Sequence, residues 1–357
     1  MRPMFRPVFR PAPLSIGLMA TLLSSAALAE VPQVATDIAP VHSLVAQVMG
    51  DLGEPVLIVR PGASPHGYSM RPSEAQALDG ADLVVWIGEG LTPWLEGPIG
   101  TLSDGAAILE LMSVEGTLLH DYREGATFAA HDHGDDADHD HDHDHDHDHD
   151  KAEKAEAHDH DHDHDHDHDK AETDASHGGD HAGHDHSGAD AHAWLDPANG
   201  RVWLGAIAAE LSRLDPENAA TYAANAAEGQ AALTALEAEL TAQLAPLAET
   251  GFVVFHDAYQ YFEHRFGLAA AGAISFSDAT APSAGRIAEL RAAVAGMGAA
   301  CVFAEPQFSS GLVETVFGDS VTIGLLDPLG QDIAPGPALY PQVLRGMAGA
   351  FSTCLGS

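Results

Sequence analysis

The sequence contains few cysteines, few basic residues and, after its N-terminus, no long apolar run. Only two of the 357 residues are cysteine. The sequence has 15 basic and 54 acidic residues, which gives a formal net charge of −39. This charge argues against a nucleic-acid binder that depends on phosphate contacts. No later apolar run approaches the length of a transmembrane helix. The sequence has neither a CxxC nor an HExxH pair, so two common signatures of metal sites are absent.

Residues 1–29 resemble a secretion signal. Arg2, Arg6 and Arg10 precede the apolar run Leu14–Leu23, and Ala27–Ala29 supplies small residues at the cleavage positions. The run is too short to span a bilayer comfortably, so we expect cleavage rather than a retained anchor, with the mature chain beginning near Glu30. The sequence therefore predicts a soluble, exported protein.

The two cysteines, Cys301 and Cys354, would meet an oxidising compartment after export. A disulfide between them is the favoured interpretation, and it would close a loop of about 50 residues. Two buried free thiols or two metal ligands remain the alternatives. Metal ligation is disfavoured because neither cysteine has a CxxC partner.

Short apolar runs alternate with amphipathic stretches along the mature chain. Strands are predicted at Pro55–Val59, Asp82–Ile87, Ala107–Leu111, Phe252–Phe255, Cys301–Ala304 and Val321–Leu326, and helices at Val41–Met49, Arg201–Leu214, Ser283–Ala295 and Pro341–Phe351. This alternation predicts an α/β fold with mostly parallel strands flanked by helices. A proline-poor stretch rich in Ala, Glu and Leu predicts one long helix, which Asp215 and Pro216 can begin. We therefore expect an N-terminal lobe at 30–214, a linking helix at 215–247 and a C-terminal lobe at 248–357.

Residues 131–186 form a low-complexity segment that holds 18 of the 24 histidines. The same thirteen residues occur at His141–Glu153 and at His160–Glu172, which indicates a tandem duplication. Alternating His and Asp cannot bury an apolar core, so we expect a disordered loop. Imidazole favours Zn, Cu and Ni over Mg or Ca. We interpret the segment as a collector of metal ions with weaker affinity than a rigid site, and a solvated linker is the alternative.

Four residues stand at or near predicted strand ends, where the strands of open α/β sheets face the ligand crevice. They are His66, His192, His256 and Asp327. Three imidazoles and one carboxylate would form a closed tetrahedral site suited to Zn²⁺. His42, His120 and His264 lack that placement, and we interpret them as surface or capping residues, although His120 could also belong to the metal-collecting loop.

At these positions the chain resembles the periplasmic zinc-receptor family of bacterial ABC importers. The resemblance covers nearly the whole mature chain and rests on the histidine-rich insertion and on the motifs Gly62–Pro72, Gly88–Leu95, Asp190–Pro197, Phe255–Tyr259, Phe303–Phe308 and Leu326–Gly330. It implies two α/β lobes joined by a long backbone helix, with zinc bound in the cleft by His66, His192 and His256. It also implies delivery to an inner-membrane ABC permease with a cytoplasmic ATPase by a monomeric receptor, and a cysteine pair that matches Cys301 and Cys354.

One departure from the family concerns the fourth ligand. Some zinc receptors carry a glutamate just before the first histidine, whereas this chain has Pro65 there. The fourth ligand is therefore Asp327 or a water molecule, and Asp327 is the favoured candidate.

Three other functions remain open from the sequence. A manganese or iron receptor of the same family is the main alternative, although three neutral imidazoles favour zinc. A secreted zinc hydrolase would need a general base beside an open coordination position, and Glu305 is the best candidate for that base. The third alternative is a periplasmic zinc buffer in which residues 131–186 carry the function.

Overall fold

A computed structural model describes residues 31–123, 127–128, 188–275, 283–297, 301–307, 317–318 and 321–356. The predicted signal at 1–29 and the His/Asp-rich segment at 131–186 lie outside these residues. Within them, no helix is both long and apolar enough to cross a membrane.

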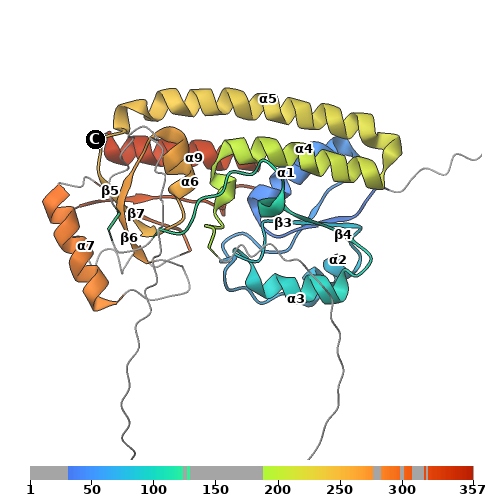
Figure 1. The fold of residues 1–357 in the computed structure, drawn as a ribbon, viewed down its shortest axis with the longest axis horizontal. Coiled ribbons are helices and arrows are strands. Elements are labelled where there is room, and N and C mark those ends of the chain that lie inside the picture. The colour runs from blue at the N-terminus through green and yellow to red at the C-terminus, as the bar shows by residue number, and fades with distance from the viewer. Residues whose placement is uncertain are drawn as a thin grey trace, which may run out of the picture.

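Two parallel four-stranded sheets form the centres of two lobes, as the alternating sequence pattern predicts (Figure 1). The first sheet has the order β2-β1-β3-β4 and consists of Val34–Thr36 (β1), Val56–Leu57 (β2), Leu83–Trp86 (β3) and Ala107–Glu110 (β4). The second has the order β6-β5-β7-β8 and consists of Phe252–His256 (β5), Ala270–Ser275 (β6), Cys301–Ala304 (β7) and Thr322–Leu325 (β8). In both sheets the first strand in the sequence lies inside the sheet. The carboxyl ends of β1 and β5 are therefore flanked by strands on both sides, where parallel sheets commonly bind ligands.

The long predicted helix is present and runs across both lobes (Figure 1). It consists of a 3₁₀ turn at Pro216–Asn218, the helix α5 at Ala219–Leu244 and a second 3₁₀ turn at Ala245–Leu247. Asp215 begins it through its side chain, whose Oδ2 accepts hydrogen bonds from Asn218 and Tyr222 at 2.7 and 2.8 Å. At 1.5 Å per residue α5 is about 39 Å long.

Three further helices pack against α5 and carry its contacts into both sheets. They are α1 (Ala39–Met49), α4 (Pro197–Leu214) and α9 (Leu339–Leu355). One continuous core contains Leu44 of α1, Trp203 of α4, Leu236 of α5 and Phe351 of α9, all at most 2% exposed. Because the lobes share this core, relative movement between them would disturb close-packed side chains.

The remaining helices cover the outer parts of each lobe. In the N-terminal lobe, α2 (Pro72–Asp79) and α3 (Pro93–Leu102) pack against each other and contribute Leu78 and Leu95 to the second core on that sheet. In the C-terminal lobe, α6 (Gln260–Phe266) follows β5 directly, and α7 (Ala284–Met297) packs against β6.

A disulfide joins Cys301 in β7 to Cys354 in α9, across 53 positions of sequence. It connects an inner strand of the second sheet to a helix of the shared core. The disulfide predicted from the two cysteines is therefore confirmed, and neither cysteine is a free thiol or a metal ligand.

Candidate metal site

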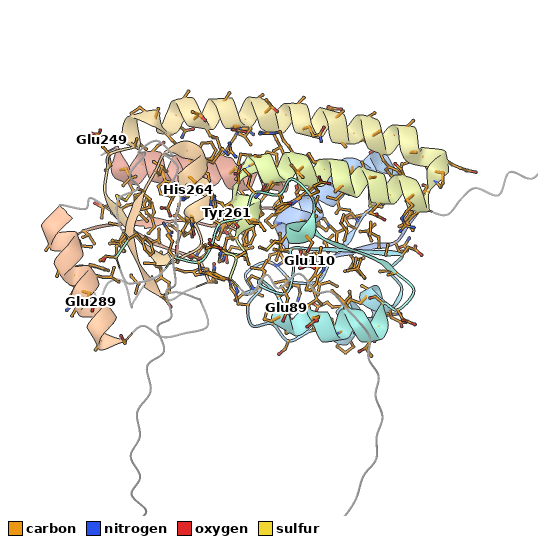
Figure 2. The ribbon with its side chains drawn as sticks, viewed as in Figure 1. Glu89, Glu110, Glu249, Tyr261, His264 and Glu289 are labelled. Atoms are coloured by element: carbon orange, nitrogen blue, oxygen red, sulfur yellow. A yellow bond between two sulfur atoms is a disulfide. The ribbon has the colours of Figure 1, made fainter. Side chains whose placement is uncertain are left out.

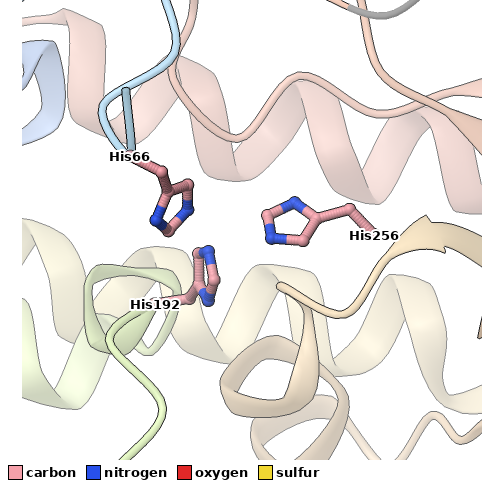
Figure 3. A group of neighbouring side chains, drawn as sticks. All are labelled: His66, His192 and His256. Carbon is pink, nitrogen blue, oxygen red and sulfur yellow. The ribbon is translucent and has the colours of Figure 1, made fainter. Parts of the chain in front are cut away.

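The three predicted histidines meet between the two lobes (Figure 3). His66 lies in the loop that follows β2, His192 directly precedes the 3₁₀ turn Ala193–Leu195, and His256 is the last residue of β5. Their ring centroids are 5.4, 5.6 and 4.8 Å apart. One ligand nitrogen from each ring lies within 4.8 Å of the other two.

This spacing fits a single zinc ion after a small closure. Zn–N bonds of about 2.0–2.1 Å in a tetrahedron place ligand nitrogens about 3.4 Å apart. Since the three nitrogens lie within 4.8 Å of one another, no pair has to approach by more than about 1.4 Å. A small cavity lined by all three histidines has a volume of about 10 Å³. That is the size of one small occupant such as a water molecule or an ion. A larger cavity of about 880 Å³ lies between α1 and α5, and none of the three histidines lines it.

Buried carboxylates orient two of the three imidazoles. Nδ1 of His192 is 2.6 Å from Oδ1 of Asp190, and Nδ1 of His256 is 3.2 Å from Oε1 of Glu305. Asp190 and Glu305 are 1% and 2% exposed. A carboxylate that holds one ring nitrogen of a histidine leaves the other nitrogen directed at a metal and fixes the tautomer. Within the described part of the chain, Nε2 of His192 is buried and has no hydrogen-bond partner.

Burial keeps the His192 imidazole in the form that binds metal. Desolvation, and then the nearby His256 ring, hold the pKa of His192 well below its ordinary 6.5. Desolvation also raises the pKa of Asp190 to about 7. The pair thus avoids a full charge separation inside the protein, and His192 has a neutral ring at neutral pH, as a metal ligand requires.

Tryptophan side chains fix the two loops on either side of the histidines. Nε1 of Trp94 donates to the carbonyl of Pro65 at 2.7 Å, immediately before His66. Nε1 of Trp194 donates to the carbonyl of Pro328 at 2.9 Å. The second bond links the N-terminal lobe to the loop after β8 and closes one side of the cavity.

Asp327 follows β8 as predicted, but it lies outside the group of mutually close ligand atoms. Its Oδ1 accepts the backbone amides of Leu329 and Gly330 at 3.2 and 2.8 Å, and its Oδ2 accepts that of Gln331 at 2.7 Å. The carboxylate therefore shapes the loop 328–331. Its role as the fourth ligand stays a prediction.

The other three histidines that the structure describes lie outside the cluster, and one interpretation needs correction. His42 is 3% exposed inside α1, where Nε2 is 3.0 Å from the carbonyl of Pro55. It is a buried structural residue and not a surface residue, because the first turns of α1 pack against the sheet. His120 and His264 stack on each other with ring centroids 4.4 Å apart; His264, beside Tyr261 on α6, is exposed (Figure 2).

The family model for the periplasmic component A of zinc-uptake complexes matches residues 34–354. The high-affinity zinc uptake system protein ZnuA of Brucella abortus (strain 2308) is 43% identical over 343 residues, covering 96% of this chain and 97% of that protein. The ZnuA of Paracoccus denitrificans (strain Pd 1222) is 45% identical over 345 residues, covering 95% and 98%. The chain belongs to this family.

Solved structures share the fold. A crystal structure of ZnuA gives a TM-score of 0.64 at 23% identity, covering 90% of this chain and 99% of that one. The Mn²⁺ complex of FpvC from Pseudomonas aeruginosa gives 0.66 at 19% identity, covering 91% and 99%. A ZnuA deletion mutant with zinc bound also shares the architecture, with a TM-score of 0.65 at 22% identity, covering 91% of this chain and 98% of that one. The fold by itself therefore does not select the ion.

Family membership makes the protein a transport component and not an enzyme, so the zinc hydrolase considered from the sequence is set aside. The geometry gives Glu305 a different role from the general base of a hydrolase, because it lies against Nδ1 of His256. Asp190 had no assigned role in the sequence. Its position two residues before His192 was the available signal, since short Asp side chains commonly accept backbone amides two positions on.

Proposed function

We propose that the protein is the zinc receptor of a high-affinity uptake system and that His66, His192 and His256 are ligands of the transported Zn²⁺. The convergence of three imidazole nitrogens within 4.8 Å of one another carries the proposal. Two of the rings are held by buried carboxylates, which supports their readiness to bind. Neutral imidazoles favour Zn²⁺ over the oxygen-preferring Mg²⁺ and Ca²⁺.

The fourth position is proposed for Asp327 or for a water molecule. The carboxylate of Asp327 already accepts three backbone amides, two on Oδ1 and one on Oδ2, so Oδ2 is the oxygen that keeps a lone pair for a metal. Only one carboxylate would then bind the ion, and Mn²⁺ prefers sites richer in oxygen ligands. A manganese or iron receptor is the alternative within the family.

Capture and delivery divide between parts of the chain. We propose that residues 131–186 collect zinc with weaker affinity and that the lobes at 30–214 and 248–357, joined by the helix at 215–247, hold the tight site. The receptor, exported after cleavage of residues 1–29, delivers the ion to an inner-membrane ABC permease driven by a cytoplasmic ATPase, and it acts as a monomer.

The intact mass of the exported protein tests the cleavage, and a retained Met1 would contradict it.

Calorimetric zinc titration of ligand variants tests the site. We expect the affinity of the tight site for zinc to fall in each of three variants, His66→Ala, His192→Ala and His256→Ala. The fall should exceed the 10–100-fold that loss of an outer partner costs. His264→Ala should change this affinity little. His42 is unsuitable as a control because it is buried. Each variant should be made with and without residues 131–186, so that the histidines of that segment do not mask the loss. Unchanged tight binding in His192→Ala would remove the assignment, and tighter binding of Mn²⁺ than of Zn²⁺ would favour the alternative metal.

A further inference from the structure

Arg123 precedes the His/Asp-rich segment in the sequence of the N-terminal lobe, yet its guanidinium is buried against two acids of the C-terminal lobe. Its side chain is 8% exposed, and its carboxylate partners Asp257 and Glu263 are 5% and 0% exposed. Nη1 and Nη2 donate to the two oxygens of Glu263 at 2.9 and 3.0 Å. Nε donates to Asp257 at 3.0 Å, and Nη2 donates to the same carboxylate. One planar guanidinium thus holds two acids by paired hydrogen bonds.

The backbone on both sides of Arg123 is fixed as well. Tyr122 donates its amide to the carbonyl of Gly188 at 3.1 Å, so the described residues before and after the His/Asp-rich segment lie side by side. Beyond Arg123, Phe128 donates its amide to Ala271 in β6 at 2.9 Å, and Cζ of Arg123 lies 3.9 Å from the centre of the Phe128 ring. The chain is therefore attached across the two lobes at this point.

One of the two acids directly follows a proposed ligand, and the other holds the start of the neighbouring strand. Asp257 directly follows His256, the last residue of β5. Oε2 of Glu263 also accepts the amide of Ala270, the first residue of β6, at 2.8 Å. Through these two carboxylates Arg123 connects the end of β5 to the start of its neighbouring strand.

Arg123 also lies at the approach to the three imidazoles. A cavity of about 360 Å³ next to the site is lined by all three histidines together with Gly90, Tyr122, Arg123 and Asp257. Tyr122 and Arg123 therefore line the same cavity as the three imidazoles.

We propose that Arg123 is a positioning residue that slows the release of the bound metal, an inference that rests on the proposed zinc site. The guanidinium fixes the strand end that carries His256 and holds Tyr122 against the approach cavity. Lysine keeps the charge at this position but has no planar fork, so it cannot hold both carboxylates in paired hydrogen bonds. Arg123→Lys should therefore loosen the approach without leaving the two buried acids uncompensated.

The experiment measures zinc release from the full mature protein. Protein loaded with one equivalent of zinc is mixed with excess chromophoric chelator in a stopped-flow instrument, and the slow phase reports the tight site. Arg123→Lys should accelerate the slow phase by about tenfold, which corresponds to the lower end of the affinity loss caused by removing an outer partner of a metal ligand. Phe128→Ala, which retains both ion pairs, should also accelerate the slow phase, but by a smaller factor. If Arg123→Lys does not fold, the release rate of Phe128→Ala tests the proposal instead.

Arg265→Lys is the matched control. Arg265 also pairs with two carboxylates, Asp196 and Glu237, but it does not line the cavity beside the histidines. Zinc release from the Arg265→Lys protein should stay within about twofold of the wild-type rate, since the side chain of Arg265 is partly exposed. With Co²⁺ bound, the visible absorption bands should change in Arg123→Lys and not in Arg265→Lys, which a general loss of stability would not produce.

Wild-type release rates in both Arg123→Lys and Phe128→Ala would overturn the inference, and so would equal acceleration in Arg265→Lys. Failure of the proposed function looks different. In that case the wild-type protein itself would show no slow phase.

Discussion

Asp190 contacts both the ring and the backbone of His192. Oδ1 of Asp190 lies 2.6 Å from Nδ1 and accepts the backbone amide of His192 at 3.0 Å. Asp190→Asn keeps the size of the side chain but removes the carboxylate that orients the ring. We expect zinc affinity to fall by about 10–100-fold, measured by competition with a chelator. Asp121→Asn is the control, because Asp121 is a nearby exposed acid, and an equal loss there would show that net charge matters rather than orientation.

Protons and zinc compete for the same imidazole nitrogens, so acid should release the metal. Desolvation lowers the pKa of His192 from its ordinary 6.5, so its ring stays neutral when the pH falls just below that value. Protonation of the ring displaces zinc only at a lower pH, and bound metal lowers the pH of protonation further. Zinc occupancy measured after dialysis should therefore persist at pH 6.5 and decline as the pH falls further. An occupancy that stays constant down to about pH 4 would argue against imidazole ligands.

The sequence identified the histidines because each follows a recognisable apolar run or precedes a helix, and parallel strand ends gather in space. It did not indicate which carboxylates face them. Glu305 was expected only as a possible general base, whereas the structure places it against His256. Such contacts join residues 49 positions apart, and no local pattern encodes them.

Strand and helix prediction succeeded where the apolar runs were long. The strands β1 and β6 were missed, since Val34–Thr36 has only three residues and Ala270–Ser275 is mostly Ala, Gly and Ser. The helices α1 and α4 begin two and four residues earlier than predicted, at Ala39 and Pro197. Both have proline in the first turn, where the missing amide costs no helical hydrogen bond. The short helices α2, α3 and α6 were also missed, because seven to ten residues give little periodicity.

The disulfide should matter more for folding than for the metal. It closes a loop of 53 positions between β7 and α9, which on the chain-entropy model contributes about 3 to 4 kcal/mol to the free energy of unfolding. Replacing both cysteines by alanine should lower that free energy by about this amount in urea denaturation. Zinc affinity of the folded variant should change little, because neither cysteine lines the small cavity. A large loss of affinity at full stability would contradict this separation.

Across the whole molecule, α5 and the shared core tie the lobes together, so we expect the site to close by small adjustments rather than by a wide hinge. The proposed ligands all lie outside residues 131–186. Deleting this segment should therefore leave the unfolding temperature and one tight zinc ion unchanged while several weaker zinc equivalents disappear from the calorimetric titration. Loss of the tight ion in the folded deletion protein would move the receptor function from the cleft to the segment.

The position of the bound ion tests the central claim most directly. Crystals of the mature protein with one equivalent of zinc should be measured at wavelengths on both sides of the zinc absorption edge. The account predicts one dominant anomalous peak between His66, His192 and His256, within about 2.0–2.1 Å of one nitrogen from each ring. A dominant peak elsewhere, with these three imidazoles uncoordinated, would contradict it.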